Sequence, residues 1–406
     1  MRIRVNYFIY IFCLLPFLEM PRFGKIPNIN TLFLAWKLLA AIIVCVLLIK
    51  KRYKLNKLDI SLIIYWGIVI SSTLINHGMI VDSISDGLAI LIPIFNVEMN
   101  MEKCSLRELI TPIILCFSIY TTITAIQLLN VPFYVFATHG LRESMLYLYT
   151  DKYGEIFALG HPKRFSFIIF PLIIYALMLD RNNDIVSINS VKHTLTKIYI
   201  IIVSVFCLVY SWSVSAMITI AIILFFYHLY SVESISKIWK YLNVKLILCG
   251  FFVINILLLV PSFLNLFAKL LKLFGKTTTL SGRTYIWEKG INYIMQRPIL
   301  GYGFDSKLVA SRFWGLVHLH NYLLNSLYIG GILLLICIVY VLILLAKHLS
   351  QIGTNSTLGR ALTLGFLGFL ILSLTDTTDY NMLFLLFPFM YTNNSTNIDY
   401  KGKRIG

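Results

Sequence analysis

Charged side chains are scarce in this sequence. Aspartate, glutamate, lysine and arginine together make up 13% of its 406 residues, while 58% of the residues are hydrophobic. A chain of this length with so little polar material cannot cover the surface of a soluble globule. The composition therefore excludes the soluble classes of protein and predicts an integral membrane protein.

The sequence also lacks any paired-cysteine motif. None of its seven cysteines forms a C-x-x-C pair, and no histidines and cysteines stand at metal-ligand spacing. Six lie inside apolar segments, namely Cys13, Cys45, Cys116, Cys207, Cys249 and Cys337, and only Cys104 lies in a predicted loop. This distribution argues against a disulfide framework and against a zinc site, so we expect no metal and no cofactor.

Two further features are missing. The first apolar run, Asn6 to Met20, is followed by Pro21-Arg22-Phe23 and not by a small-residue cleavage site, so we predict a membrane helix there and not a cleaved signal. The two halves of the chain show no repeat, and there is no low-complexity tract. A transporter would be expected to have related halves, so this asymmetry argues against one.

What the sequence does contain is a series of long apolar runs. About 20 apolar residues are needed to cross the hydrocarbon layer, fewer where neighbours shelter the helix. The predicted spans are 6–20, 31–49, 60–75, 79–97, 109–129, 165–179, 198–210, 213–230, 246–260, 321–346, 360–375 and 380–391. The sequence thus predicts an all-α integral membrane protein, a single polytopic domain over 1–406 with about 12 helices, or 10 to 11 if short runs do not span.

The distribution of lysine and arginine sets the orientation. With the N-terminus in the cytoplasm, the inner loops hold Lys50, Lys51, Arg52, Lys54, Lys57, Arg181, Lys192, Lys197, Lys237, Lys240, Lys347, Lys401, Lys403 and Arg404. The short outer turns at 76–78, 211–212 and 376–379 hold no lysine or arginine. The bias predicts that both termini are cytoplasmic and that two long segments, 130–164 and 262–320, lie outside.

The second external segment is strongly basic. It carries Lys269, Lys272, Lys276, Arg283, Lys289, Arg297, Lys307 and Arg312, against Glu288 and Asp305. The formal net charge of +17 could suggest nucleic acid, but basic residues scattered between apolar runs do not form a nucleic-acid interface. The local surplus instead indicates an anionic partner at the outer leaflet.

Local patterns divide this external segment further. Apolar and lysine residues alternate at helical spacing over 263–276, which predicts a helix lying in the membrane interface. Ser281 is then a predicted N-cap for a helix that runs to Met295, and Pro298 ends it. Gly301-Tyr302-Gly303 is expected to make a tight turn, and the next helix is expected to begin at His320-Asn321.

These residues carry a resemblance. The ensemble Ser281-Gly282-Arg283 with Trp287, Arg297-Pro298-Ile299-Leu300-Gly301-Tyr302-Gly303-Phe304, and His320-Asn321-Tyr322-Leu323 resembles the shared domain of the O-antigen ligase and polysaccharide polymerase superfamily. It covers about residues 197–391. The first half of the chain resembles, in its general pattern, the Wzy-type repeat-unit polymerases of capsular and exopolysaccharides in Gram-positive bacteria. The features that carry this resemblance are Leu15-Pro16-Phe17, residues 72–78 and Asn130-Val131-Pro132.

The sequence departs from the family at one position. After the seventh span many members read Ser-Arg-x-Ala, whereas this chain reads Ser213-Val214-Ser215-Ala216 and lacks the arginine. A site with two arginines therefore cannot be copied directly from the ligases. Arg164, at the outer end of the sixth span, is our candidate for the second cation.

The resemblance implies the chemistry. The family's donors are polyprenyl-pyrophosphate-linked oligosaccharides, and a bidentate arginine can stabilise the pyrophosphate as it leaves. Arg283 is the catalytic candidate for that task, with Arg312 and Arg164 as further donor-binding residues. His320 is the candidate to accept the proton of the acceptor hydroxyl or to orient the sugar. The motif residues expected to be structural are Gly282, Trp287, Pro298, Gly301, Gly303 and Asn321.

Plainer interpretations compete for several residues. His318 is interpreted as an interfacial residue, and Trp287 and Tyr302 as packing or interface anchors. Asp82 and Asp86, one turn apart, are either a coupling site or solvated acids. The last acidic pair, Asp376 and Asp379, is expected to form a short polar outer turn and not a catalytic or metal site.

The sequence therefore predicts a metal-independent glycosyltransferase in the bacterial cytoplasmic membrane that polymerises lipid-linked repeat units on the outer face. Its partners would be the polyprenyl-linked oligosaccharide and membrane lipid, with a chain-length regulator and a flippase as further candidates. One alternative is a ligase that transfers the same donor to lipid A core or protein. Another is a flippase, but only Lys37, Asp82, Asp86 and Arg360 fall within or beside the predicted spans.

Overall fold

The protein is all-α wherever the structure describes it. The computed structural model describes residues 5–130, 157–160, 164–179, 188–211, 213–229, 243–266, 283–313, 318–353, 356–377 and 381–391, and these ranges contain helices and turns but no strand. The predicted fold class is confirmed. The predicted interfacial helix over 263–276 falls mostly outside these ranges, and Ser281, Gly282 and Asp379 lie outside them altogether.

The helices follow the apolar runs closely. In chain order they are α1 (Val5–Leu14), η1 (Leu15–Leu18), η2 (Phe23–Lys25), α2 (Pro27–Lys50), α3 (Lys57–Ile75), α4 (Ile80–Met101), α5 (Leu106–Leu129), α7 (Ser166–Met178), α8 (Ile188–Tyr210), α9 (Val214–Leu229), α10 (Val244–Leu258), α11 (Pro261–Leu266), α13 (Arg283–Gln296), α14 (Ser306–Arg312), α15 (Tyr322–Ile352), α16 (Thr357–Thr375), α17 (Asn381–Phe384) and α18 (Phe387–Tyr391).

Six of the described helices, α2, α3, α4, α5, α15 and α16, are long and apolar enough to cross a membrane. Five shorter apolar helices accompany them within the described ranges, at Asn6–Leu18, Ser166–Met178, Thr194–Tyr210, Val214–Leu229 and Val244–Leu258. The protein is therefore a multi-pass membrane protein.

Two expectations about the spans need correction. The last predicted span, 380–391, is not one helix but the short helices α17 and α18, separated by a turn at Leu385 and Leu386. The helices also extend beyond the predicted spans. They include Asp59 in the first turn of α3 and Glu98 near the end of α4, so helical charges are more numerous than expected.

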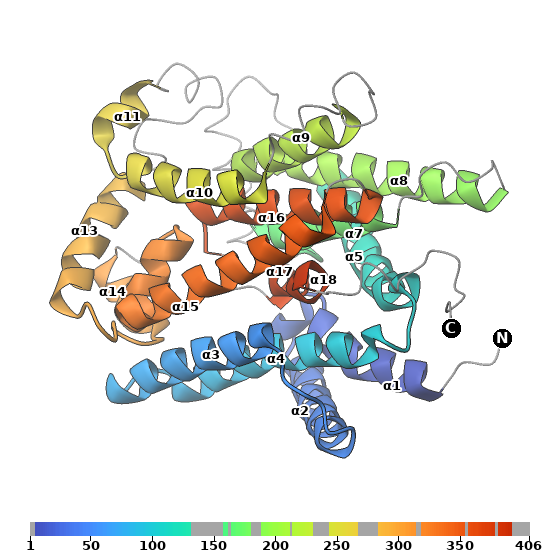
Figure 1. The fold of residues 1–406 in the computed structure, drawn as a ribbon, viewed down its shortest axis with the longest axis horizontal. Coiled ribbons are helices and arrows are strands. Elements are labelled where there is room, and N and C mark those ends of the chain that lie inside the picture. The colour runs from blue at the N-terminus through green and yellow to red at the C-terminus, as the bar shows by residue number, and fades with distance from the viewer. Residues whose placement is uncertain are drawn as a thin grey trace.

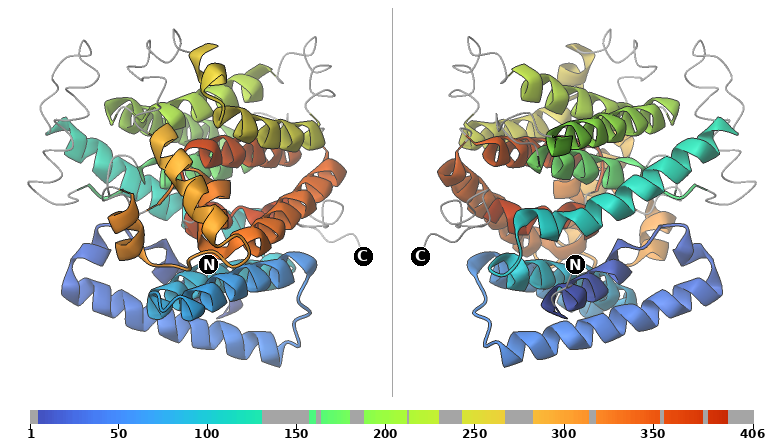
Figure 2. Two further views of the ribbon diagram at one scale, coloured as in Figure 1. Left: turned by 90° about the vertical axis from the view of Figure 1, so that its left-hand side faces the viewer. Right: turned by 90° about the vertical axis from the view of Figure 1, so that its right-hand side faces the viewer.

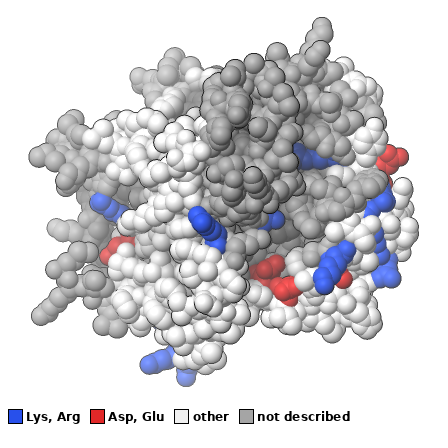
Figure 3. Space-filling view, turned by 180° about the vertical axis from the view of Figure 1, so that it is seen from behind, with Lys and Arg blue, Asp and Glu red and all other residues white. Residues whose placement is uncertain are grey.

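Helix α15 is the central element of the bundle (Figure 1). It packs against α3, α10, α13, α16 and α18. Helix α2 lies at the edge (Figure 2), and only 11% of its most apolar window is buried within the protein. Most of the described surface on the face in Figure 3 carries no charge. Such a surface suits contact with lipid acyl chains.

A break in α15 explains the motif Pro298–Gly303. Gly331 interrupts the helix with a φ of 63°, and the segment after α13 fills the gap. Tyr302 and Gly303 donate their N–H groups to the carbonyls of Tyr328 and Ile329 at 2.8 and 2.9 Å. In return, the N–H of Ile332 donates to the carbonyl of Pro298 at 2.8 Å. The motif is therefore not a simple tight turn, because it satisfies the backbone groups that the break exposes.

The end of α3 holds the same segment from the other side. The Ser72 hydroxyl donates to the carbonyls of Leu300 and Ile329, and the Thr73 hydroxyl accepts from the N–H of Phe304 at 2.9 Å. The Asn76 side chain donates to the carbonyl of Gly301 at 3.3 Å. These contacts join the first half of the chain to residues 300–304 of the second half.

Candidate active site

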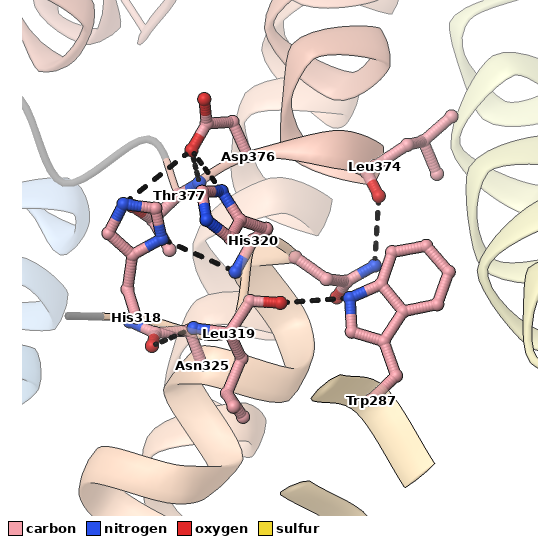
Figure 4. A network of polar contacts seen from close by, with 9 residues as sticks. Trp287, His318, Leu319, His320, Asn325, Leu374, Asp376 and Thr377 are labelled. Carbon is pink, nitrogen blue, oxygen red and sulfur yellow. Dashed lines mark hydrogen bonds and ion pairs between the residues drawn. The ribbon is translucent and has the colours of Figure 1, made fainter. Parts of the chain in front are cut away.

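The structure brings together two histidines and one aspartate (Figure 4). The Oδ1 atom of Asp376 lies 3.5 Å from Nδ1 of His320 and 4.0 Å from Nε2 of His318. The exposed fractions of these side chains are only 19% to 20%, so the cluster is largely shielded from solvent. At 3.5 Å the contact between Asp376 and His320 is an electrostatic pair, and the Nδ1 atom of His320 has no full hydrogen bond.

Asn321 fixes the position of this cluster. Its side-chain oxygen caps α15 by accepting from the N–H of Leu324 at 3.0 Å. Its amide nitrogen donates to Oδ1 of Asn255 on α10 and to the carbonyl of Leu374 near the end of α16. The start of α15 is thereby tied to the end of α16, immediately before Asp376.

The backbone before the cap is held in an uncommon conformation. His320 has a φ of 50°, in the left-handed region that non-glycine residues rarely adopt. Its own N–H donates to Nδ1 of His318 at 3.3 Å, and the N–H of Leu319 donates to Oδ1 of Asn325 at 3.3 Å. Surrounding contacts stabilise this conformation, which turns the His320 imidazole towards Asp376.

Trp287 on α13 supports the same segment. Its indole N–H donates to the carbonyl of Leu319 at 2.8 Å, and its side chain is 1% exposed. Gly290, one turn later, leaves room for Leu319, whose side chain would meet a Cβ there at 3.0 Å. Burial of Trp287 and of Tyr302, which is 4% exposed, fits packing and leaves no face open for stacking on a sugar.

Arg283 belongs to the cluster because of helix geometry. It begins α13 and lies four residues before Trp287, so both side chains share one face of the helix. Burial alone would raise the pKa of Asp376. The contact with His320 and the nearby His318 and Arg283 outweigh burial and lower that pKa. Asp376 is therefore ionised at neutral pH, and the Arg283 cation lies within its electrostatic reach.

Arg164 also reaches the cluster. The chain before it is anchored at Ala158 and Leu159, whose N–H groups donate to the side chains of Gln127 and Thr124 on α5 at 2.8 and 3.0 Å. The pKa of His318 is lowered to about 4, first by burial and then by His320, Arg164 and Arg283, against the opposing attraction of Asp376. His318 is therefore neutral at pH 7, with two arginine cations near it.

Arg312 lies in a different environment. Its guanidinium carbon is 4.1 Å from the ring centre of Tyr302 and 4.8 Å from that of Tyr293, and Nη1 donates to the Tyr328 hydroxyl at 2.8 Å. This arrangement is a cation–π contact with a charge-assisted hydrogen bond, which holds the segment after the motif against α15. The structure thus groups Arg283, Arg164 and His320, while Arg312 is engaged by tyrosines.

Two members of the cluster differ from the expectations. Asp376 is not a solvated outer turn, because it is four-fifths buried beside His320, and its Oδ1 accepts from the N–H of Thr377 at 2.9 Å. His318 is likewise part of the cluster and not a separate interfacial residue. A signal was available in the sequence: Asp376 follows the end of one predicted span and His320 begins the preceding one, so antiparallel neighbours place both at the same end of the bundle.

The cluster combines functions that a transfer reaction requires. It has a histidine paired with a carboxylate, and two arginines that provide positive charge nearby. Among the described residues, His318, His320 and Asp376 are also the group that could hold a metal ion, with one ligand atom of each within 4.8 Å of the others.

Comparison with known proteins identifies the family that part of the chain resembles. The described helices define a multi-pass membrane protein with a polar cluster at one end of its bundle. Residues 199–339 match the family model described as O-Antigen ligase, so this region of the chain is similar to the O-antigen ligase family. The match indicates an enzyme of the ligase or polymerase type, whose family acts on lipid-linked oligosaccharides. No curated protein matches the chain.

Proposed function

We propose that this protein polymerises polyprenyl-pyrophosphate-linked oligosaccharide repeat units into a surface polysaccharide on the outer face of the bacterial cytoplasmic membrane. The growing glycan would leave its lipid carrier and join the non-reducing end of an incoming lipid-linked repeat unit. The observation that carries the proposal is the contact of His320 with Asp376 beside Arg283 and Arg164. Of these residues, Arg283 and His320 lie inside the region that matches the family, residues 199–339.

The donor side of the reaction is assigned to the two arginines. Cleavage of the bond between the anomeric carbon and the pyrophosphate oxygen leaves the electron pair on the pyrophosphate. Arg283 and Arg164 stabilise this developing charge, and the N-terminus of α13 adds a positive helix-dipole end beside Arg283. Arg164 comes from the first half of the chain and lies near the same cluster. It takes the place of the arginine that is missing at 213–216. Arg312 would act from its tyrosine contacts at the edge of the donor site.

The acceptor side is assigned to His320. With Nδ1 facing Asp376, the Nε2 atom is free to take the proton of the acceptor hydroxyl as its oxygen attacks the anomeric carbon. The carboxylate of Asp376 holds the ring and stabilises the imidazolium that forms. One direct displacement of this kind inverts the anomeric configuration. The residues assigned here supply both the charge stabilisation and the base, so the proposed reaction requires no metal.

The experiment that tests the proposal is a transfer assay with purified protein. The full-length protein in detergent is given a polyprenyl-pyrophosphate-linked repeat unit without divalent metal, and products are resolved on a gel. We expect a ladder with a spacing of one repeat unit. Its rate should fall about 10²- to 10³-fold in Arg283→Ala and about 10²- to 10⁴-fold in His320→Ala. Lys289→Ala, on the same helix as Arg283, is the matched control and should keep the wild-type rate.

The other outcomes assign the alternatives. Transfer only after a lipid A core or protein acceptor is added would mean a ligase. No transfer to either acceptor, together with movement of the lipid-linked unit across a vesicle membrane, would overturn the enzyme assignment in favour of a flippase. A ladder that persists in both variants would contradict the proposed site.

A further inference from the structure

The cluster at the outer ends of α15 and α16 has a second chemical property, which concerns metal ions. Two imidazole nitrogens and one carboxylate oxygen form a ligand set that suits a borderline divalent cation. The Asp376 oxygen lies 3.5 and 4.0 Å from the two ring nitrogens, and one ligand atom of each residue lies within 4.8 Å of the others. Tetrahedral zinc ligands lie about 3.3 Å apart, so small side-chain rotations would complete the site.

The Nδ1 atom of His320 is an independent indication of a ligand. It is buried, makes no hydrogen bond, and points at the carboxylate of Asp376. A buried ring nitrogen without a hydrogen bond is uncommon in folded proteins. A cation placed between the three residues would satisfy it. The side chains are 19% to 20% exposed, so an ion has access to them.

We propose that His318, His320 and Asp376 bind Zn²⁺, and that the bound ion inhibits glycosyl transfer by occupying His320. The inhibitory half of the inference rests on the proposed function, whereas the binding half does not. Both histidines remain neutral ligands, and Asp376 supplies the negative charge. Water would complete the coordination.

The inhibition follows from the tautomers. When Zn²⁺ coordinates Nδ1 of neutral His320, the ring proton is confined to Nε2, which can then no longer accept the proton of the acceptor hydroxyl. Coordination through Nε2 of His318 moves its proton to Nδ1 and gives up only the 3.3 Å contact with the N–H of His320. Arg283 and Arg164 repel a dication, so we expect micromolar binding and not the tight binding of a structural zinc site.

The nature of the ligands also sets the selectivity. Mg²⁺ and Ca²⁺ prefer oxygen ligands, so a site with one carboxylate and two imidazoles binds them weakly. Zn²⁺ and Co²⁺ accept this set in tetrahedral geometry. Co²⁺ therefore serves as a visible probe for the same site.

The binding experiment uses the full-length protein purified without a polyhistidine tag. Titration calorimetry with Zn²⁺, and the absorption spectrum with Co²⁺, should show one ion per chain for the wild type and none with Mg²⁺. His318→Ala and Asp376→Asn should each weaken binding at least tenfold. His228→Ala removes an exposed histidine from the last turn of α9, outside the cluster, and should leave the affinity unchanged.

A second measurement on the wild type avoids any question of variant folding. Histidine modification by diethyl pyrocarbonate, mapped by mass spectrometry, should be slowed at His318 and His320 by Zn²⁺ and not by Mg²⁺. The proposal is overturned if the wild type binds no Zn²⁺, if His318→Ala and Asp376→Asn bind it as tightly as the wild type, or if modification of both histidines is indifferent to Zn²⁺.

The transfer assay separates the two proposals. Zn²⁺ should stop the ladder in the wild type, a chelator should restore it, and His318→Ala should need at least tenfold more Zn²⁺ for half-inhibition of its own rate. Zn²⁺ binding without any transfer activity would contradict the proposed function and support the metal site. Transfer that Zn²⁺ does not affect, with no Zn²⁺ bound, would do the reverse.

Discussion

Asp376 shows how much the reactivity of one histidine depends on a single neighbour. Its carboxylate is the anion nearest to Nδ1 of His320 among the described residues, at 3.5 Å. Two arginine cations lie close to the same ring cluster and disfavour a second positive charge there. Without the carboxylate, the imidazolium that forms during transfer would be left unbalanced. Asp376 therefore matters for the proton step more than for substrate binding.

We predict that Asp376→Asn lowers kcat for polymerisation about 10²- to 10⁴-fold and changes the KM for the donor little, because the amide keeps the shape and loses the charge. Initial rates of ladder formation over a range of donor concentrations measure both constants. Asp82→Asn, which removes another acid on the outer side, is the control and should behave as the wild type. A higher KM with unchanged kcat would instead assign Asp376 to substrate binding.

At the scale of the element, α13 positions both Arg283 and the backbone of Leu319, the residue before His320. Trp287 is the point of contact, since its indole N–H donates to the carbonyl of Leu319. We predict that Trp287→Phe destabilises the protein by about 1 to 3 kcal/mol, because a buried carbonyl loses its donor. Thermal unfolding in detergent measures the loss. Tyr285→Phe, at an exposed position of the same helix, should leave the Tm unchanged. An equal Tm for both variants would contradict the stabilising role of the Trp287 contact.

The motif segment that fills the break in α15 makes a separate prediction. Gly303 has a φ of 73°, and a Cβ there would lie 2.5 Å from the Cα atom of Thr73. We predict that Gly303→Ala costs at least the roughly 1–2 kcal/mol of the left-handed conformation, and more because backbone atoms must move. Gly67→Ala on α3, where nothing lies within 4 Å of the added atom, is the control and should be neutral or stabilising. Comparable Tm values for the two variants would show that the contact is not tight.

The elements were more predictable from the sequence than the contacts between them. Apolar runs located the helices because lipid requires every spanning segment to satisfy its own backbone. The break at Gly331 was not predictable, since its hydrogen bonds come from residues 298–303 and from the end of α3. Asp376 was undervalued for the same reason. A carboxylate at the end of a span has no local pattern that distinguishes a solvated turn from a partner of His320.

At the scale of the whole molecule, the loops segregate to two sides. Lys51, just beyond α2, has a pKa that burial and then the nearby Lys103 lower, so the α2–α3 and α4–α5 loops lie together. At the other ends of α3 and α4, the N–H of Met79 donates to the carbonyl of Phe304 at 2.9 Å. The short α3–α4 turn therefore lies on the same side as the catalytic cluster. The basic α2–α3 and α4–α5 loops and the cluster therefore occupy opposite faces, which is the arrangement that the positive-inside rule predicts for the proposed reaction on the outer face.

This segregation predicts the outcome of a labelling experiment. In a background in which the other cysteines are replaced, Cys104 lies in the α4–α5 loop and should react with a membrane-impermeant thiol reagent only after cells are permeabilised. A cysteine introduced as Lys289→Cys on α13 should react in intact cells, because α13 belongs to the outer face that receives the lipid-linked donor. Mass-tagging on a gel reads both positions. The reverse pattern would place the cluster in the cytoplasm, where nucleotide sugars are available, and would remove the reason for a lipid-linked donor.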